Sequence, residues 1–320
     1  MPATPWVAGQ RVRVAVPASS ANLGPGFDSV GVALDIVDHC TLSVRSDPGV
    51  EVRVSGQGSG TVPLDDQHLV VRSMRRAWEV IGVRAPSGYL VECHGAVPHG
   101  RGLGSSATAI VAGVGAAYAL HALATSGRAA IDLGAVNDLA ANLEGHPDNS
   151  SASVYGGMTL SWPDDYPGEG DIPRTMTVCL SPHPDIRPVV LVPQDQLSTA
   201  TARAVLPSQV RLADAAANAA RVGALVHAMT QAPGLLLAAT RDYLHQEPRR
   251  PAYAASMAMV DSLRQAGIAA VISGAGPSVL ALAVAEQAGF VAARAPQTWR
   301  IVDPGFALVG VRVLDEPVPE

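Results

Sequence analysis

The sequence predicts a compact protein that contains both helices and strands and is divided into two domains, and three observations support this. The chain has 320 residues, of which 48% are hydrophobic and 16% charged, enough apolar material for one large or two ordinary cores. Segments of alternating polarity, typical of strands, are interspersed with apolar segments at helical spacing. A run rich in Pro, Gly, Asp and Glu, Pro163–Pro173, interrupts the pattern and indicates a domain boundary.

The first half of the chain alternates between expected strands and expected helices. Strand patterns cover residues 11–16, 40–45, 50–54, 89–93 and 155–162. Helical spacing covers residues 68–81 and 131–143, and an almost unbroken apolar run covers 108–123. This last run is long enough to raise the question of a membrane span. Its Ala and Gly content and the polar His121 inside it favour a buried core helix instead.

The second half continues with the same mixture. Strands are expected at 175–180 and 187–192, and alanine-rich helices at 214–229 and 233–244. The segment 269–280 predicts a strand, a loop of small residues, and then another strand or helix. Small residues in such a loop let the backbone approach a ligand or another loop closely.

The charged residues exclude several classes of function. The formal net charge is −6 and no arginine-rich run is present, which argues against nucleic-acid binding. The chain has no lysine, so all 22 basic residues are arginine. Walker-type phosphate loops, the protein-kinase fold and Schiff-base catalysis all require a lysine, so the sequence excludes them.

The cysteines and the N-terminal segment predict a cytoplasmic protein. Cys40, Cys93 and Cys179 are an odd number of cysteines at wide spacing, as expected for free thiols in a reducing compartment. The first residues, Met1–Pro5, show no basic region followed by an apolar core, so a signal peptide is not expected.

The segment Pro98–Ala107 is expected to be the centre of the functional site. It holds three glycines and two serines between an expected strand and the apolar helix. The unpaired N–H groups at the start of a helix carry partial positive charge and attract phosphate. Ser105 and Ser106 can cap the helix or bind magnesium. A capped helix after a flexible loop is the alternative interpretation, and without lysine any phosphate must be held by backbone amides, a metal ion and Arg101.

Two further polar segments are candidates for binding. Pro17–Asp28 is dense in turn formers and places Asn22 and Asp28 at the end of a strand, although an ordinary loop has a similar composition. Glu144–Ser150 follows an expected helix and is unusually rich in acidic, amide and imidazole side chains. Asp138 lies two turns earlier on that helix, and together with a serine of the facing loop it would suit magnesium, with plain surface polarity as the alternative.

The chain resembles the GHMP small-molecule kinases and, within them, the homoserine kinases. Residues 17–28 (PASSANLGPGFD) resemble the first motif, 101–107 (RGLGSSA) the phosphate loop, and 273–278 (SGAGPS) the third motif. Residues 144–149 (EGHPDN) and the segment Ser198–Pro207 are similar to segments particular to the homoserine kinases. The resemblance covers nearly the whole chain and keeps the motifs in order.

This resemblance implies a two-domain α+β fold with the active site in the cleft between the domains. An N-terminal ribosomal-S5-like domain that binds the nucleotide would cover residues 1–165, and a C-terminal ferredoxin-like domain residues 166–320. The implied activity is phosphoryl transfer from ATP, with Mg²⁺, to the side-chain hydroxyl of L-homoserine in threonine biosynthesis. The family often forms homodimers, so a homodimer is expected, without nucleic-acid or membrane partners.

The resemblance also implies a role for individual residues. The nucleotide would contact His68, Arg101, Gly102, Leu103, Gly104, Ser105 and Ser106. Magnesium would be held by Ser106 and Asp138, where Asp138 replaces a more usual glutamate. L-homoserine would contact Asn22, Asp28, His146, Arg203, Arg249 and Gly274, with the arginines pairing with its carboxylate.

Catalytic roles would fall to Asp28, Asn149 and Thr199. Because an asparagine cannot accept the proton, catalysis is expected to rest on positioning and charge neutralisation, with Asp28 as the candidate base. Two alternatives remain at this stage: a related kinase acting on another small alcohol, and a non-catalytic ligand sensor.

Overall fold

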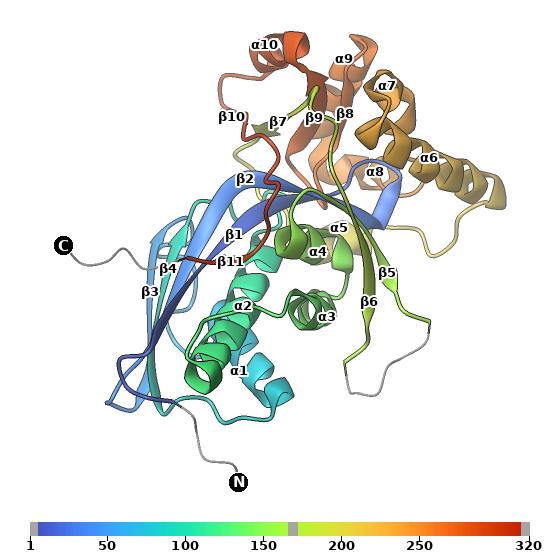
Figure 1. The fold of residues 1–320 in the computed structure, drawn as a ribbon. Helices are drawn as coiled ribbons and strands as arrows, with labels where there is room; N and C mark the ends of the chain where they lie inside the picture. Colours follow the sequence, from blue (N-terminus) through green and yellow to red (C-terminus); the bar gives the residue numbers. More distant parts are fainter. Residues whose placement is uncertain (1–5, 166–171, 315–320) are drawn as a thin grey trace.

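The computed structural model describes residues 6–165 and 172–314, which form two layered units stacked on one another (Figure 1). The lower unit in Figure 1 holds the N-terminal strands and the helices α1 to α4, and the upper unit holds the later helices and a second sheet. The predicted mixed α+β architecture is confirmed by this arrangement.

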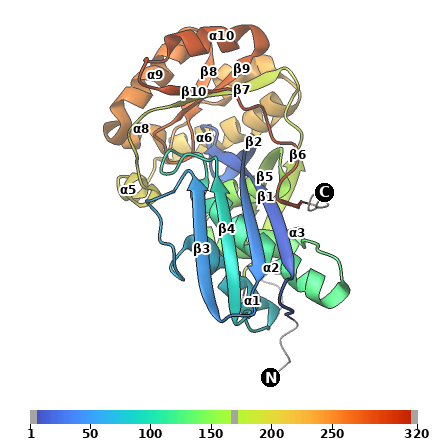
Figure 2. The same cartoon turned by 90° about the vertical axis from the view of Figure 1, so that its left-hand side faces the viewer.

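The N-terminal unit is built on a large sheet that curves along one side of its helices (Figure 2). Its strands are β1 (Arg11–Asn22), β2 (Gly26–Val44), β3 (Gly49–Gly56), β4 (Gly88–Gly95), β5 (Met158–Pro163), β6 (Thr175–Leu180) and β11 (Arg312–Val313). The order is β11-β1-β2-β4-β3, and β5 pairs with both β2 and β6. Only the β3–β4 pairing is parallel among these pairs.

Helix α2 (Ser105–Ser126) is the core of the N-terminal unit. It packs against α1 (Leu69–Ile81), α3 (Leu133–Glu144), α4 (Pro147–Tyr155) and the sheet. By length and composition α2 could cross a membrane, but 67% of its apolar window is buried inside the structure. It is therefore the buried core helix that its Ala- and Gly-rich sequence predicts.

The C-terminal unit has the strand and helix order of a ferredoxin-like domain. Its antiparallel sheet follows the order β10-β7-β9-β8, made of β7 (Ile186–Val192), β8 (Ala269–Ile272), β9 (Val279–Val284) and β10 (Arg300–Val302). Its helices are α5 (Thr199–Ala204), α6 (Leu212–Thr230), α7 (Leu236–Ala239), α8 (Gln246–Arg249), α9 (Ala254–Gln265) and α10 (Ala285–Arg294). Short 3₁₀ turns occupy Pro233–Leu235 and Arg250–Tyr253. The succession of elements is βαββαβ.

One apolar cluster joins the two units. From the N-terminal unit it takes buried residues such as Leu23, Val32 and Leu103, and from the C-terminal unit residues such as Val190 and Leu225. A second face of the C-terminal sheet packs on α9 and α10 in a separate cluster. Because the first cluster is continuous, the relative position of the two units is set by packing rather than by a linker.

Two strands that follow the proposed domain boundary, β6 and β11, belong to the N-terminal sheet. The proposed boundary between residues 165 and 166 borders residues 166–171, which lie outside the described part of the chain. On either side of them β5 and β6 pair in the same N-terminal sheet. Near the other end, β11 returns to pair with β1. The N-terminal sheet therefore contains strands from both halves of the chain, and the sheets, rather than a single cut in the sequence, define the two units.

Three local predictions differ from the structure. The turn-rich segment at residues 17–28 is mostly strand, because β1 runs on to Asn22 and β2 begins at Gly26. The polar segment after Glu144 is not only a helix stop: Pro147 starts the new helix α4, a position where its missing N–H costs nothing. The expected helix at 233–244 is broken into a 3₁₀ turn and the short α7.

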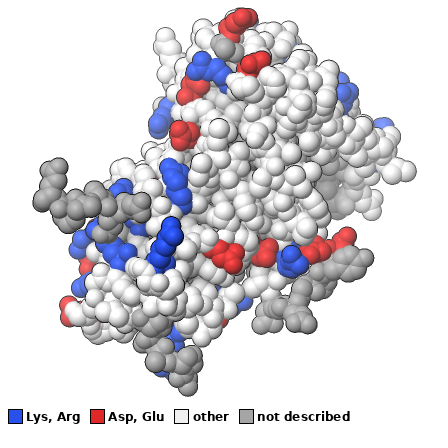
Figure 3. Space-filling view, in the orientation of Figure 1, with Lys and Arg blue, Asp and Glu red and all other residues white. Residues whose placement is uncertain are grey.

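Charged side chains are scattered over the face of the molecule shown in Figure 3, where most of the visible surface is uncharged. Arginines gather at the left of this view, over the strands of the N-terminal sheet. Acidic groups lie at the top, over the C-terminal unit, and near the centre and right of the view.

Helix α4 lies so close to β2 that a glycine is required between them. A Cβ built on Gly31 would lie 2.0 Å from the carbonyl oxygen of Asp148. This contact fixes the helix that carries several of the predicted site residues.

We predict that Gly31→Ala lowers the free energy of unfolding by about 1–3 kcal/mol, because the backbone of α4 must shift. Gly223→Ala in α6 is the control: its Cβ would meet nothing within 4 Å, so better helix propensity should raise stability by up to about 1 kcal/mol. Urea unfolding of both variants measures the difference, and equal effects would contradict the tight contact.

Candidate active site

The glycine- and serine-rich loop leads into the start of α2, as the sequence predicts. Gly104 is the N-cap residue of α2, with φ +69°, and no described side chain caps the helix. Neither Ser105 nor Ser106 acts as a cap, so the first amides of α2 remain available to an anion. Thr108 donates its hydroxyl proton back to the carbonyl of Gly104 at 2.9 Å and steadies the first turn.

Two glycines of this loop are required by the close approach of other segments. A Cβ on Gly102 would lie 2.2 Å from the carbonyl oxygen of Ser273, and one on Gly104 would lie 2.1 Å from Oγ of Ser19. Both residues also have positive φ, which other side chains rarely adopt. The loop is therefore held between the first and third motifs, and glycine makes that possible.

Hydrogen bonds connect the three motif segments directly. The Ser273 hydroxyl donates to the carbonyl of Gly102 at 2.6 Å and lies 2.8 Å from the hydroxyl of Ser20. The amide of Ser278 donates to the carbonyl of Arg101 at 3.3 Å, and that of Gly274 to the carbonyl of Ala21 at 3.1 Å. Segments far apart in the sequence are thereby fixed around one point.

The turn from β1 to β2 holds two of the predicted substrate-binding residues in an uncommon backbone conformation. Asn22, Leu23 and Asp28 have φ values of +70°, +47° and +54°. Asn and Asp tolerate this region, whereas leucine does so only when its surroundings hold it there. Leu23 is fully buried in the cluster between the two units, which provides that restraint.

Asn22 links the two units through its amide. Its Nδ2 donates to the carbonyl of Gly274 at 3.0 Å, and its Oδ1 accepts the amide proton of Asp28 at 3.0 Å. The carboxylate of Asp28 is held in turn by the guanidinium of Arg203, which donates to both carboxylate oxygens, one of them at 3.1 Å. The hydrogen bond to Asp28 raises the pKa of Arg203.

Two arginines of the C-terminal unit lie beside the ring of Phe27. The guanidinium carbons of Arg203 and Arg249 are each 5.5 Å from the centre of the Phe27 ring. Arg249 is almost fully buried and donates through Nε to the carbonyl of Ala202 at 2.8 Å. Burial lowers the pKa of Arg249 because a buried charge is costly. An anion bound in the polar cavity, which Arg249 lines, would offset that cost.

Acidic and imidazole groups from the end of α3 and the start of α4 form the other wall. Nδ1 of His146 lies 2.8 Å from Oδ1 of Asp148, and burial alone would lower the pKa of His146, but Asp148 and Glu144 raise it overall. Atoms of Asp28, His146 and Asp148 all lie within 4.8 Å of one another. This cluster places negative charge opposite the arginines.

Asn149 lies beneath the phosphate-loop segment. Its Oδ1 accepts a hydrogen bond from Oγ of Ser19 at 3.0 Å, next to Gly104. An amide held in this way positions its neighbours but has no site for an extra proton.

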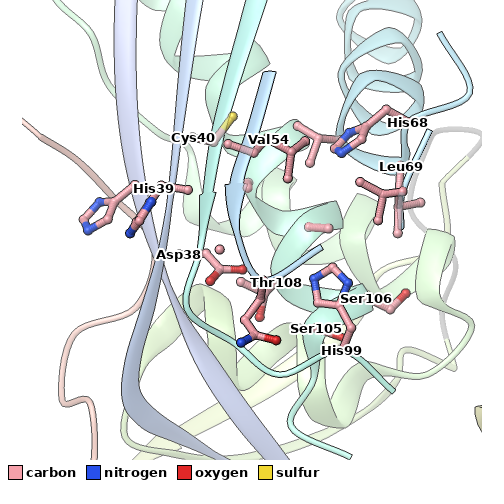
Figure 4. A pocket seen from close by; sticks show the side chains of 18 of the residues that line it. Asp38, His39, Cys40, Val54, His68, Leu69, His99, Ser105, Ser106 and Thr108 are labelled. Atoms are coloured by element: carbon pink, nitrogen blue, oxygen red, sulfur yellow. The ribbon is translucent and has the colours of Figure 1, made fainter. Parts of the chain in front are cut away.

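Two cavities meet at the start of α2. The first, of about 310 Å³, lies between α1, the sheet and α2, and His68, Val54 and Cys40 line it (Figure 4). The second, of about 200 Å³, is polar and lies between the two units. Ser105 and Ser106 line both cavities.

The polar cavity gathers most of the predicted site. Of the residues expected from the sequence, it is lined by Asn22, Asp28, Gly102, Gly104, Ser105, Ser106, His146, Asn149, Thr199, Arg203, Arg249 and Gly274. His68 lies in the apolar cavity instead, with its Nδ1 buried and unpartnered, and burial lowers its pKa.

The prediction that Asp138 holds magnesium is not supported by its contacts. It lines neither of the two cavities, and its Oδ1 accepts the backbone amide proton of Thr175 at 2.8 Å, in β6. The carboxylate beside Ser106 belongs to Glu144, whose Oε2 accepts the Ser106 hydroxyl proton at 2.9 Å. Asp138 and Glu144 are six residues apart on α3. Glu144 is the last residue of that helix, so it is the carboxylate that reaches the loop with Ser106.

Arg101 and Leu103 belong to the loop without presenting side chains to either cavity. The Arg101 guanidinium donates to the carbonyls of Pro193, at 2.8 Å, and Gln194 beyond the end of β7. Leu103 is buried in the cluster between the units. Both side chains hold the loop in place, so the prediction that Arg101 grips the phosphate is not supported by its contacts.

Some residues at the site were not predicted from the sequence. Glu144 is the first residue of the segment EGHPDN, but no role was predicted for it. Its position at the end of an expected helix could have indicated a contact with the serine-rich loop. Ser19 and Phe27 stood inside the first motif, but nothing in their spacing indicated a contact with Asn149 or with two arginines.

Known proteins resemble the chain in both sequence and fold. Family models for the GHMP kinases match residues 68–157 (N terminal domain) and 215–301 (C terminal). The homoserine kinase of Streptomyces coelicolor is 47% identical over 303 residues, 95% of this chain and 94% of that protein. That of Rhodococcus erythropolis is 48% identical over 86% of each chain. The crystal structure of homoserine kinase from Cytophaga hutchinsonii superimposes with a TM-score of 0.78 at 25% identity, covering 97% and 99% of the two chains.

The chain therefore belongs to the GHMP kinases, a family of ATP-dependent phosphotransferases. Within the family it belongs to the homoserine kinases, because it is similar to several of them over most of their length.

Proposed function

We propose that this protein transfers the γ-phosphoryl group of ATP to the side-chain hydroxyl of L-homoserine and forms O-phospho-L-homoserine, a step of threonine biosynthesis. The observation that carries the proposal is that Ser105 and Ser106 line both cavities. The uncapped start of α2 thus lies between a mostly apolar cavity and a polar one that contains two arginines. A nucleotide and a small charged substrate can meet there.

The apolar cavity suits the base of the nucleotide. At about 310 Å³ it lies at the small end of the range of ligand pockets, and Val54, Leu69 and Ala112 contribute apolar walls. The buried Nδ1 of His68, without a partner, offers one hydrogen bond to a ring nitrogen or exocyclic group of the base. The triphosphate would then follow the amides of residues 102–106 at the helix start.

The polar cavity suits the substrate because its charges match those of an amino acid. Arg203 and Arg249, which both lie beside Phe27, would bind the carboxylate. The group formed by Asp28, His146 and Asp148 would bind the ammonium. Asn22, Thr199 and Gly274 complete the wall and would orient the hydroxyl toward the helix start.

Positioning rather than a strong base is expected to drive the transfer. Asn149 cannot accept a proton, and both carboxylate oxygens of Asp28 already accept hydrogen bonds from Arg203. Asp28 would have to leave that pairing to take the proton of the hydroxyl. Holding the hydroxyl in line, and placing cationic and amide groups around the transferred phosphoryl, supplies the catalysis instead.

Magnesium would be held by Ser106 and Glu144. Hydroxyl and carboxylate oxygens are the ligands this ion prefers, and the two side chains are 2.9 Å apart. Burial raises the pKa of Glu144 because it destabilises the charged carboxylate. A cation bound beside the carboxylate would stabilise its charged form. The ion would neutralise charge on the phosphates during transfer. A homodimer and a cytoplasmic location remain predictions.

We predict ADP release with L-homoserine and magnesium ATP, and much less with 3-aminopropan-1-ol, the same molecule without its carboxylate. Each charged hydrogen bond to the carboxylate contributes about 1.5–3 kcal/mol, so the preference in kcat/KM should be about tenfold or more for each arginine engaged. A coupled ADP assay with a panel of amino alcohols measures it. Turnover only with another alcohol would assign a different substrate, and no turnover at all would favour a non-catalytic sensor.

Glu144 and Asp138 lie on the same helix, and only Glu144 is proposed to hold magnesium. We predict that Glu144→Gln weakens the apparent affinity for Mg²⁺ by about 10–100-fold or more, measured by titrating magnesium at saturating ATP. Asp138→Asn serves as the matched control, since its Oδ1 can still accept the Thr175 amide and its carboxylate lies outside the cavities. A larger loss in the Asp138 variant would restore the original assignment.

A further inference from the structure

Two cysteines face each other across neighbouring strands of the N-terminal sheet. Cys40 of β2 is directly opposite Cys93 of β4, between the pairs His39–His94 and Thr41–Glu92. Directly opposite residues of an antiparallel pair share one face of the sheet, with Cβ atoms about 4.5–5.5 Å apart. The Cα atoms of such a pair are about 4.5–5.5 Å apart. This separation lies within the range of about 4.4–6.8 Å that a disulfide spans.

The two thiols differ in accessibility. Cys40 is 2% exposed and packs in the core beneath the sheet, whereas Cys93 is partly exposed. Both line the apolar cavity, and Figure 4 shows Cys40 on its strand side near Val54, with His68 on the helix side. A small molecule that enters this cavity therefore reaches the pair.

The thiols also interact with each other. The hydrogen bond with Cys93, together with burial and nearby negative charge, raises the pKa of Cys40. Cys40 is thus a poor first nucleophile, because the thiolate is the reactive form. The more accessible Cys93 is the thiol that meets a reagent first, and Cys40 is in position to react second.

We propose that Cys40 and Cys93 form a reversible dithiol–disulfide modification site in the wall of the apolar cavity, oxidised by low-molecular-weight disulfides. The Cys93 thiolate attacks one sulfur of the reagent, forms a mixed disulfide and releases one thiolate. Cys40 gives its proton to solvent and its sulfur attacks the Cys93 sulfur, which releases the second thiolate. The protein loses two hydrogen atoms, and the reagent disulfide is reduced to two thiols.

Oxidised glutathione is the probe, applied to the folded full-length protein, followed by alkylation of free thiols, tryptic digestion without reductant, and mass spectrometry. The expected product is a disulfide linking the peptide with Cys40 to the peptide with Cys93, and dithiothreitol should reverse it. Cys179, exposed on β6, is the internal control for an ordinary surface thiol. The readout does not depend on kinase activity, so it stands or falls separately from the proposed function.

Two variants test the order of the steps. Cys40→Ser should accumulate glutathione on Cys93, because the second thiol is missing, and Cys179→Ser should form the Cys40–Cys93 link as readily as the unaltered chain. A lasting glutathione adduct on Cys93 in the unaltered chain would overturn the proposal. So would unreacted Cys40 and Cys93 under conditions where Cys179 is fully modified, a result that needs no variant to fold.

Discussion

The active site depends on the apolar packing that joins the two units. Leu23 and Leu103, one from the first motif and one from the phosphate-loop segment, are both buried in the shared cluster with side chains of β7 and α6. Truncating a buried leucine to alanine typically costs about 2–5 kcal/mol, so each is a strong anchor. With these anchors in place, the backbones of three distant segments come close enough that Gly102 and Gly104 have no room for a side chain.

The arrangement of charge follows from the absence of lysine. Kinases with a phosphate-binding lysine bring a mobile cation to the nucleotide, whereas this chain offers fixed amides at the start of α2 and, as proposed, a magnesium ion beside Glu144. Its arginines have other tasks: Arg101 holds the loop, and Arg203 and Arg249 face the proposed substrate position. Cations for the substrate and partial charges for the phosphates are thus supplied by different elements.

The sequence predicted much of this architecture because local patterns encode it. The apolar run of α2, the alternation in β1 and β4, and the glycines that precede the serines are all readable without tertiary information. The order of motifs also brought most of the polar cavity together correctly, from Asn22 to Gly274. Helix α4 was missed because its polar start, after Pro147, hides the apolar signal that marks helices.

The remaining differences concern tertiary contacts that local sequence patterns do not encode. Asp138 and Glu144 lie on the same helix, and only the three-dimensional position of the last turn shows which carboxylate meets Ser106. Arg101 likewise looks like a phosphate ligand until its carbonyl partners beyond β7 are seen. The pairing of Cys40 with Cys93 depends on strand register, which single-sequence patterns do not determine.

The most direct test of the account is a crystal structure with magnesium and a non-hydrolysable ATP analogue. The account predicts that the triphosphate lies on the backbone amides of residues 102–106, with the metal between Ser106 and Glu144 and the base in the cavity beside His68. A triphosphate bound elsewhere, or those amides turned away from it, would contradict the account.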